Sequence, residues 1–209
     1  MPAGDADSTR RNWRDRWADP GFAPHWRSDA MDEPVRRAVE DGFFARGSSV
    51  LDIGCGSGEV AAFLADQGLR ATGIDHAEPA IDRALARFGD RDGLAFRVAD
   101  FCVEAGDIGR FDAALDRGCL HSLPPAIKPD YVRALCALLP PEGGFLLLHK
   151  THKTDPARER LAVGDVRAGI EGLFSDAFET LSVEDMQFGS GSDPMPGLAF
   201  RMRRRQSPG

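Results

Sequence analysis

Short apolar runs alternate along this chain with segments whose apolar residues recur at helical spacing. The apolar runs predict buried strands at residues 48–54, 70–75, 94–100, 111–116 and 143–150. The helical spacing predicts helices at residues 31–44, 57–68, 78–89, 128–139 and 165–174, with Asp165 as the candidate N-cap of the last one. Strands that alternate with helices in this way predict a doubly wound, mainly parallel α/β sheet.

The end of the chain breaks this alternation. Two further strands are predicted at residues 178–188 and 197–205, with no helical pattern between them. We expect them to pair as an antiparallel hairpin, which makes a seven-stranded mixed sheet with helices on both faces. The basic residues 201–205 are expected to face solvent at the resulting edge, where charge prevents further strand pairing.

Composition narrows the class of protein. The 209 residues are 42% hydrophobic and 28% charged, which is typical of one globular domain. The net charge of −7 disfavours a nucleic-acid surface. No apolar run reaches about 18 residues and the first residues lack the apolar core of a signal peptide, so we expect a cytoplasmic protein without a membrane partner. The four cysteines form no CxxC pair and predict reduced thiols, not a metal site.

The most informative motif is a glycine loop directly after the first predicted strand. Gly54, Gly56 and Gly58 alternate there, and Glu59 stands where the dinucleotide fingerprint requires its third glycine. The Lys-Ser/Thr pair of a phosphate-binding loop is also missing. Asp52 precedes the loop, and its carboxylate would repel a pyrophosphate but attract an ammonium or sulfonium group.

Further acidic residues follow the next two predicted strands. Asp75 lies 21 residues after Gly54, a place that suits a carboxylate accepting hydrogen bonds from two ribose hydroxyls. Asp100 could accept from an adenine amino group while Phe101 covers the ring, and His76 could lie beside the same ring or point outward. This distribution of groups matches S-adenosylmethionine.

Residues 50–75 resemble motifs I and II of the class I S-adenosylmethionine-dependent methyltransferases. Residues 96–101 resemble their third motif and residues 111–125 their fourth, and the match continues to the end of the chain. The resemblance implies a Rossmann-like fold, a methyl-transferring enzyme and S-adenosylmethionine as cofactor. The residues expected to bind the cofactor are Trp26, Asp52, Gly54, Cys55, Gly56, Gly58, Asp75, His76, Asp100, Phe101 and Asp116.

The segment "DRGCLHSLPP", residues 116–125, is expected to border the reacting methyl group. Asp116 is the candidate for contact with the cofactor near its sulfonium or its amino-acid end. His121 is the candidate catalytic base or acceptor-orienting group, and a packing or helix-capping role is the alternative. The HKTHK segment at residues 149–153 could attract an anionic acceptor or form a solvated loop.

The N-terminal segment, residues 12–35, resembles the Trp-containing arm of the thiopurine S-methyltransferase and tellurite-resistance methyltransferase branch. Residues 1–45 are therefore expected to form a helical arm or lid, and residues 46–209 the S-adenosylmethionine-binding domain. Trp26 is favoured as a ligand contact over Trp13 and Trp17. A cap of this size favours a small acceptor.

The leading functional hypothesis is methylation of a small thiol or heteroaromatic compound, in detoxification or secondary metabolism. The alternatives are an O- or N-methyltransferase that tailors a natural product and a non-catalytic protein that binds the cofactor. "DRGC" stands where nucleic-acid amino-methyltransferases carry Asn/Asp-Pro-Pro-Tyr/Phe, and no acid cluster predicts a catalytic metal. We expect a small-molecule partner, no nucleic acid, and a monomer or weak homodimer.

Overall fold

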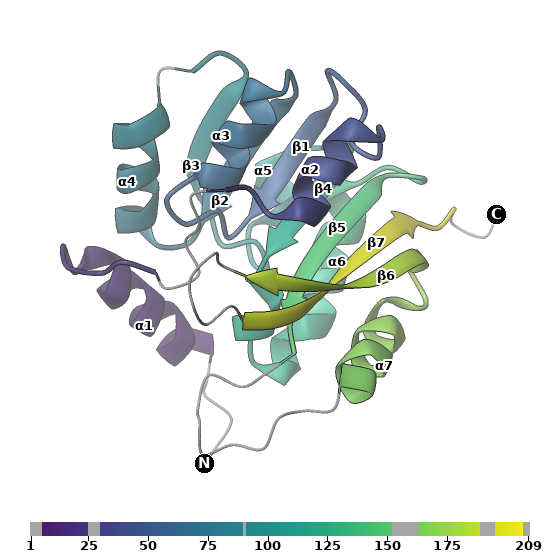
Figure 1. Ribbon diagram of the computed structural model, residues 1–209. Coiled ribbons are helices and arrows are strands. Elements are labelled where there is room, and N and C mark those ends of the chain that lie inside the picture. Colours follow the sequence, from purple (N-terminus) through teal and green to yellow (C-terminus); the bar gives the residue numbers. More distant parts are fainter. Residues whose placement is uncertain (1–5, 25–29, 90, 152–162, 189–194, 207–209) are drawn as a thin grey trace.

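A seven-stranded sheet with helices on both faces forms the centre of the protein (Figure 1). The computed structural model describes residues 6–24, 30–89, 91–151, 163–188 and 195–206. The strands are β1 (Ser49–Ile53), β2 (Arg70–Asp75), β3 (Leu94–Val98), β4 (Ala113–Arg117), β5 (Gly144–Lys150), β6 (Phe178–Phe188) and β7 (Met195–Arg204).

The strands lie in the order β3-β2-β1-β4-β5-β7-β6. The first five are parallel, and β7 runs antiparallel to both β5 and β6. The predicted mixed sheet with its antiparallel final hairpin is confirmed. The strand order reverses between β1 and β4, and open α/β sheets bind their ligands at the carboxyl ends of strands beside such a point.

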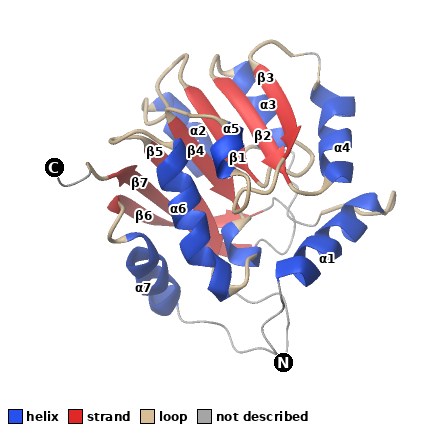
Figure 2. Cartoon of the chain, turned by 180° about the vertical axis from the view of Figure 1, so that it is seen from behind, coloured by secondary structure: helices blue, strands red, loops and turns tan. Residues whose placement is uncertain are grey.

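Helices of two groups cover the two faces of the sheet. The helices are α1 (Ala6–Ala18), α2 (Glu33–Glu40), α3 (Glu59–Asp66), α4 (Glu78–Phe88), α5 (Ala105–Ile108), α6 (Lys128–Leu138) and α7 (Val163–Phe174). One face packs against α2, α3 and α4, and the other against α5, α6 and α7, which Figure 2 shows from behind. Helix α1 packs on α4 beside the carboxyl ends of the strands.

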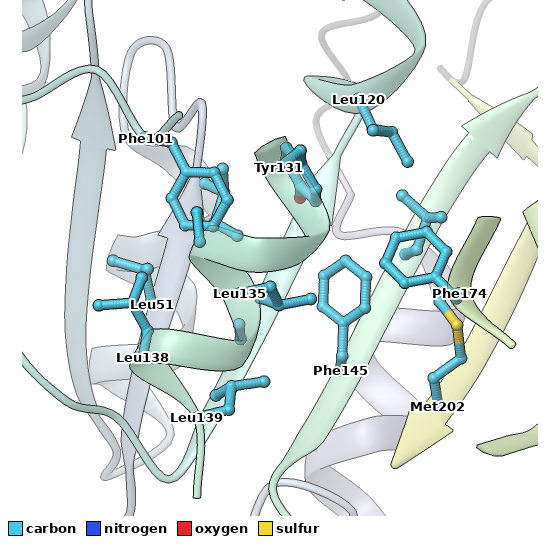
Figure 3. Packing of buried hydrophobic residues seen from close by; sticks show 14 of the residues in the cluster. Leu51, Phe101, Leu120, Tyr131, Leu135, Leu138, Leu139, Phe145, Phe174 and Met202 are labelled. Carbon is cyan, nitrogen blue, oxygen red and sulfur yellow. The ribbon is translucent and has the colours of Figure 1, made fainter. Parts of the chain in front are cut away.

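The core on the α6 and α7 face contains a group of aromatic rings (Figure 3). The Phe145 ring of β5 lies 5.6 Å from that of Phe174 and 6.5 Å from that of Tyr131, measured between centroids. Tyr131 is fully buried in the first turns of α6. This packing fixes the end of α6 that faces the carboxyl ends of the strands.

Two local predictions are wrong. Asp165 is not the N-cap of α7, because the helix begins at Val163 and Asp165 lies inside its first turn. The basic end of the chain is not a sheet edge, because β7 lies between β5 and β6 and buries Met202. Arg201 of β7 instead forms an ion pair with Asp41, and β6 is the edge strand.

Candidate active site

A cavity of about 500 Å³ lies at the carboxyl ends of the parallel strands and is bordered by α1. Its volume falls in the range of small-molecule sites. The structure brings most of the predicted site residues together in its lining: Asp52, Gly54, Cys55, Gly56, Asp75, His76, Asp100, Phe101 and His121. Gly58 and Asp116 are not in the lining, and Trp26 lies outside the described residues.

The glycine loop connects β1 to α3 in a conformation that only glycine adopts readily. Gly54, Gly56 and Gly58 have φ angles of 70°, 55° and 84°. A Cβ atom on Gly54 would lie 2.7 Å from the Cβ of Cys119, and one on Gly56 would lie 2.9 Å from Trp17 of α1. The glycine loop is therefore enclosed by α1 and by the loop that follows β4 and contains Cys119 (the β4 loop).

Gly58 allows close packing at the start of α3. A Cβ atom there would lie 2.6 Å from the ring of Phe96 and 2.9 Å from Ala84. Gly58 thus lets the start of α3 approach β3 and α4, and its contact with the cofactor stays a prediction.

Asp52 is a buried carboxylate at the end of β1. Its Oδ2 accepts a hydrogen bond from the backbone N–H of Ala61 at 3.1 Å, which ties the first turn of α3 to the strand. Burial, together with the nearby charge of Asp116, raises the pKa of Asp52 to about 7. A cation in the cavity would stabilise the ionised form of Asp52.

Asp75 holds the glycine loop from the end of β2. Its carboxylate accepts hydrogen bonds from the backbone N–H groups of Gly56, at 3.1 Å, and Ala77, at 2.9 Å. Burial raises its pKa. The neighbouring His76 lies with Nε2 3.3 Å from the carbonyl oxygen of Arg10, so the N–H form of Nε2 donates to α1.

Asp100 joins the end of β3 to α1. Its Oδ2 accepts a hydrogen bond from the Arg10 guanidinium, and its Oδ1 accepts one from the backbone N–H of Cys102 at 3.0 Å. Phe101 turns its ring toward the core, 4.7 Å from that of Tyr131. Asp100 therefore combines a place at the cavity with a contact that closes α1 over it.

Asp116 is the hydrogen-bond acceptor that organises the loop after β4. It is fully buried, and it accepts hydrogen bonds from three consecutive backbone N–H groups, those of Gly118, Cys119 and Leu120, at 2.7 to 2.9 Å. Burial raises its pKa to about 6, while the Tyr131 hydroxyl, which donates at 2.6 Å, lowers it. Asp116 thus shapes the loop after β4, and its contact with cofactor or acceptor stays a prediction.

His121 lies in the cavity wall on the loop that Asp116 holds. A Cβ on Gly118 would lie 2.8 Å from its Cε1 atom, so its ring packs on bare backbone. The rings of His149 and Phe188 meet it edge to face, at centroid distances of 5.5 and 6.4 Å. These contacts orient the imidazole, so the packing alternative and the catalytic alternative are compatible.

His149 is neutral around pH 7. Burial and the positive charges of Lys128 and Lys150 lower its pKa to about 4. Its Nδ1 lies 2.8 Å from the carbonyl oxygen of Lys150, which makes Nδ1–H the donor. The ring next to His121 thus brings no charge to the site.

Several lining residues were missed or ranked low by the sequence analysis. Trp17 of α1 is 5% exposed and covers the glycine loop, although Trp26 was favoured. Arg117 forms a buried ion pair with Asp32, and Phe188 approaches from the final hairpin. Tyr131 lies in none of the motifs described above, although it is the single tyrosine of the chain.

The cavity thiols do not have the properties of nucleophiles. Burial raises the pKa of Cys55, Cys102 and Cys119, so they stay protonated near pH 7. Within the described residues, no three His, Cys, Asp or Glu side chains are grouped as metal ligands. No helix in the described part of the chain is long and apolar enough to cross a membrane.

Comparisons with known proteins identify the class that this geometry represents. A family model described as a methyltransferase domain matches residues 24–172. The chain belongs to this family, and the predicted resemblance to class I S-adenosylmethionine-dependent methyltransferases is confirmed.

Relatives and solved structures agree with this family. The chain is 28% identical over 193 residues to a thiopurine S-methyltransferase of Pseudomonas putida, covering 82% of this chain and 86% of that protein. It is 29% identical over 127 residues to a 2-heptyl-1-hydroxyquinolin-4(1H)-one methyltransferase of Mycobacteroides abscessus, covering 60% of this chain and 55% of that enzyme. The fold matches the N-methyltransferase NodS of Bradyrhizobium japonicum in complex with S-adenosyl-L-homocysteine, with a TM-score of 0.70, 20% identity and coverage of 97% and 100%.

Replacing Asp52 by Asn tests the burial of its carboxyl. The folded chain keeps this proton up to about pH 7, whereas an unfolded Asp releases it near pH 4, so the wild-type free energy of unfolding falls as the pH rises between these values. Between pH 5 and 7 the free energy of unfolding should fall by roughly 2 kcal/mol less in the Asp52→Asn variant than in the wild type. Urea unfolding at the two pH values measures this difference.

Asp112→Asn is the matched control. Hydrogen bonds from Ser49 lower the pKa of Asp112, so it is ionised across this interval in both states and its replacement leaves the slope unchanged. Equal slopes for the wild type and Asp52→Asn would contradict the assignment.

Proposed function

We propose that this protein transfers the methyl group of S-adenosylmethionine to a small-molecule acceptor that binds in the same cavity. One observation carries the proposal: the glycine loop, the buried carboxylates at the ends of β1 and β2, and His121 line the same cavity. His121 lies on the β4 side of the point where the strand order reverses. These carboxylates suit a cofactor with an amine and a ribose, and they disfavour one held by phosphates.

The donor set suggests a place for each part of the cofactor. Asp75 would accept hydrogen bonds from the ribose hydroxyls, and Asp52 with the Gly54 backbone would face the ammonium end. Asp100, Phe101 and His76 would surround the adenine, with Cys55 and Gly56 against its inner side. Trp26 remains a proposed contact of the predicted set, and Gly58 and Asp116 would act by shaping their loops.

S-adenosylmethionine supplies, when bound, a methyl group on a positively charged sulfur. The task of this chain is then to position an acceptor atom in line with that methyl and to keep water away. Alignment of this kind contributes as much as about 7–11 kcal/mol in favourable cases. Trp17 over the glycine loop and the contact between Arg10 and Asp100 make α1 the proposed cover.

The acceptor half of the cavity is lined by His121, Phe188 and Met195, with Leu123 and Ile127 nearby. An aromatic ring that carries a thiol or a ring nitrogen fits these mixed apolar and polar walls. The names of two relatives refer to a thiopurine and a hydroxyquinolinone, both heteroaromatic compounds. A thiol or heteroaromatic acceptor in detoxification or secondary metabolism is therefore proposed, and O- or N-methylation of a natural product is the second candidate.

Asp75→Asn tests the proposed cofactor site. The amide replaces one acceptor oxygen with a donor, so the affinity for S-adenosyl-L-homocysteine should fall by about tenfold or more, the equivalent of one hydrogen bond to a charged group. Isothermal titration calorimetry measures this loss. Asp66→Asn is the control, because Asp66 lies on the surface in an ion pair with Arg91. Equal affinities of Asp75→Asn and the wild type would contradict the site, as would binding of NAD in its place.

His121→Asn tests the proposed catalytic residue. If His121 accepts the acceptor's proton, the turnover number should fall roughly 10²-fold or more while S-adenosyl-L-homocysteine affinity changes little. Turnover is measured as the release of S-adenosyl-L-homocysteine, with thiols, phenols and ring nitrogen compounds as methyl acceptors. An unchanged rate constant would remove His121 from the chemistry. Cofactor binding without turnover of any acceptor would favour the non-catalytic alternative.

A further inference from the structure

Different strand ends bring side chains of opposite charge to the cavity. The side where β1, β2 and β3 end presents the carboxylates of Asp52, Asp75 and Asp100. The side where β4 and β5 end presents Arg117 and Lys150, and Arg16 of α1 lines the same cavity. The proposed cofactor accounts for the acidic side, and of its groups only the single carboxylate of its amino-acid end could pair with a cation.

Arg117 already has a structural role. It forms an ion pair with Asp32, whose side chain is 5% exposed, and its guanidinium lies 5.6 Å from the centroid of the Phe188 ring. Asp32 directly precedes α2, so the pair fastens that segment to the end of β4. Its charge is balanced, and its effect on the acceptor is to hold Phe188 in the cavity wall.

Lys150 lies beside Arg117 at the end of β5. In the parallel register Arg117 aligns with Leu148, and side chains alternate along a strand, so Lys150, two residues later, projects from the same face. The side chain of Lys150 is half-buried at the cavity wall. It is therefore positioned to contact a bound molecule on the acceptor side.

Arg16 faces the same space from the last turn of α1. Its guanidinium lies 5.1 Å from the centroid of the Trp13 ring, which also lines the cavity. Burial lowers the pKa of Lys150, and the charge of Arg16 lowers it further, in agreement with their common place in the lining of the cavity. An anionic group bound in this part of the cavity would be attracted by both cations.

We propose that the methyl acceptor carries an anionic group, a carboxylate or comparable oxyanion, that binds between Lys150 and Arg16. This inference rests on the proposed methyltransferase function and names its substrate class. The anionic group would fix one end of the acceptor at α1 and β5, and the rest of the molecule would lie along Phe188 toward His121. Because Arg16 belongs to α1, such an acceptor would also stabilise α1 in its position over the cavity.

One other anion has to be distinguished from the acceptor. S-adenosylmethionine has a carboxylate of its own, which could contact the same cations. 5′-Methylthioadenosine lacks this amino-acid portion but keeps the adenosine. If Lys150 or Arg16 binds the cofactor carboxylate, replacing either residue would lower the affinity for S-adenosyl-L-homocysteine and leave the affinity for 5′-methylthioadenosine unchanged.

The test is calorimetric titration of matched acids and amides into the protein saturated with S-adenosyl-L-homocysteine. The probes are 4-mercaptobenzoate, 4-hydroxybenzoate and imidazole-4-carboxylate, each beside its neutral primary amide. The wild type should bind at least one acid about tenfold or more tightly than its amide, as expected for a charge-assisted contact. Lys150→Gln and Arg16→Gln should each abolish most of that preference while S-adenosyl-L-homocysteine affinity stays the same.

Arg133→Gln is the matched control, because Arg133 is an exposed cation on α6 that does not line the cavity. It should retain the wild-type preference. Arg16→Gln lies on an exposed helix and supplies the answer if Lys150→Gln does not fold.

Equal or no binding of the acids and amides by the wild type would overturn the inference, as would a selective loss of S-adenosyl-L-homocysteine affinity in the two variants. Failure of the wild type to bind S-adenosyl-L-homocysteine would instead overturn the proposed function itself.

Discussion

Two buried carboxylates at the ends of neighbouring strands hold the floor of the cavity in shape. Asp116 aligns with Ile53 in the pairing of β4 with β1, so Asp52 and Asp116 lie at the same edge of the sheet. Asp52 fastens the start of α3, and Asp116 fastens three backbone N–H groups of the following loop. The pKa values of both are raised by burial, so both depend on their hydrogen bonds and on any cation in the cavity.

The remaining features of the site follow from these two loops. The glycine loop can approach the β4 loop only because Gly54 has no side chain where Cys119 lies. The β4 loop in turn presents His121, and the aromatic core supports it through Tyr131. Stability and site geometry are thus coupled, since the same ring cluster packs α6 on the sheet and orients the hydroxyl that reaches Asp116.

The sequence was sufficient to predict the seven strands, five of the helices and most of the residues that line one side of the cavity. The strands of 70–75 and 178–188 were predicted with the bounds that the structure gives, because their apolar runs end at sharp polar or glycine boundaries. Asp75 and Asp100 were predicted because each ends a predicted strand, and Asp52 because it closely precedes the glycine loop. Strand bounds and the place of these acidic residues can be read from short stretches of sequence.

The acceptor side depends on contacts between distant segments, which local pattern does not record. Trp17 reaches the glycine loop from α1, and Phe188 reaches His121 from the final hairpin. Asp116 was predicted from its place near the end of the fourth strand, but its burial and its four hydrogen bonds appear only in three dimensions. The insertion of β7 beside β5 likewise requires the tertiary pairing, since a hairpin alone does not specify which strand is the edge.

A crystal structure of the complex with S-adenosyl-L-homocysteine would show whether the cavity holds the cofactor as proposed. We expect the ribose at Asp75, the adenine beside Asp100 and Phe101, and the amino-acid end at Gly54 and Asp52. The sulfur should then face the half of the cavity that contains His121 and Lys150. A ligand bound elsewhere, or one whose sulfur faces away from His121 and Lys150, would contradict the account.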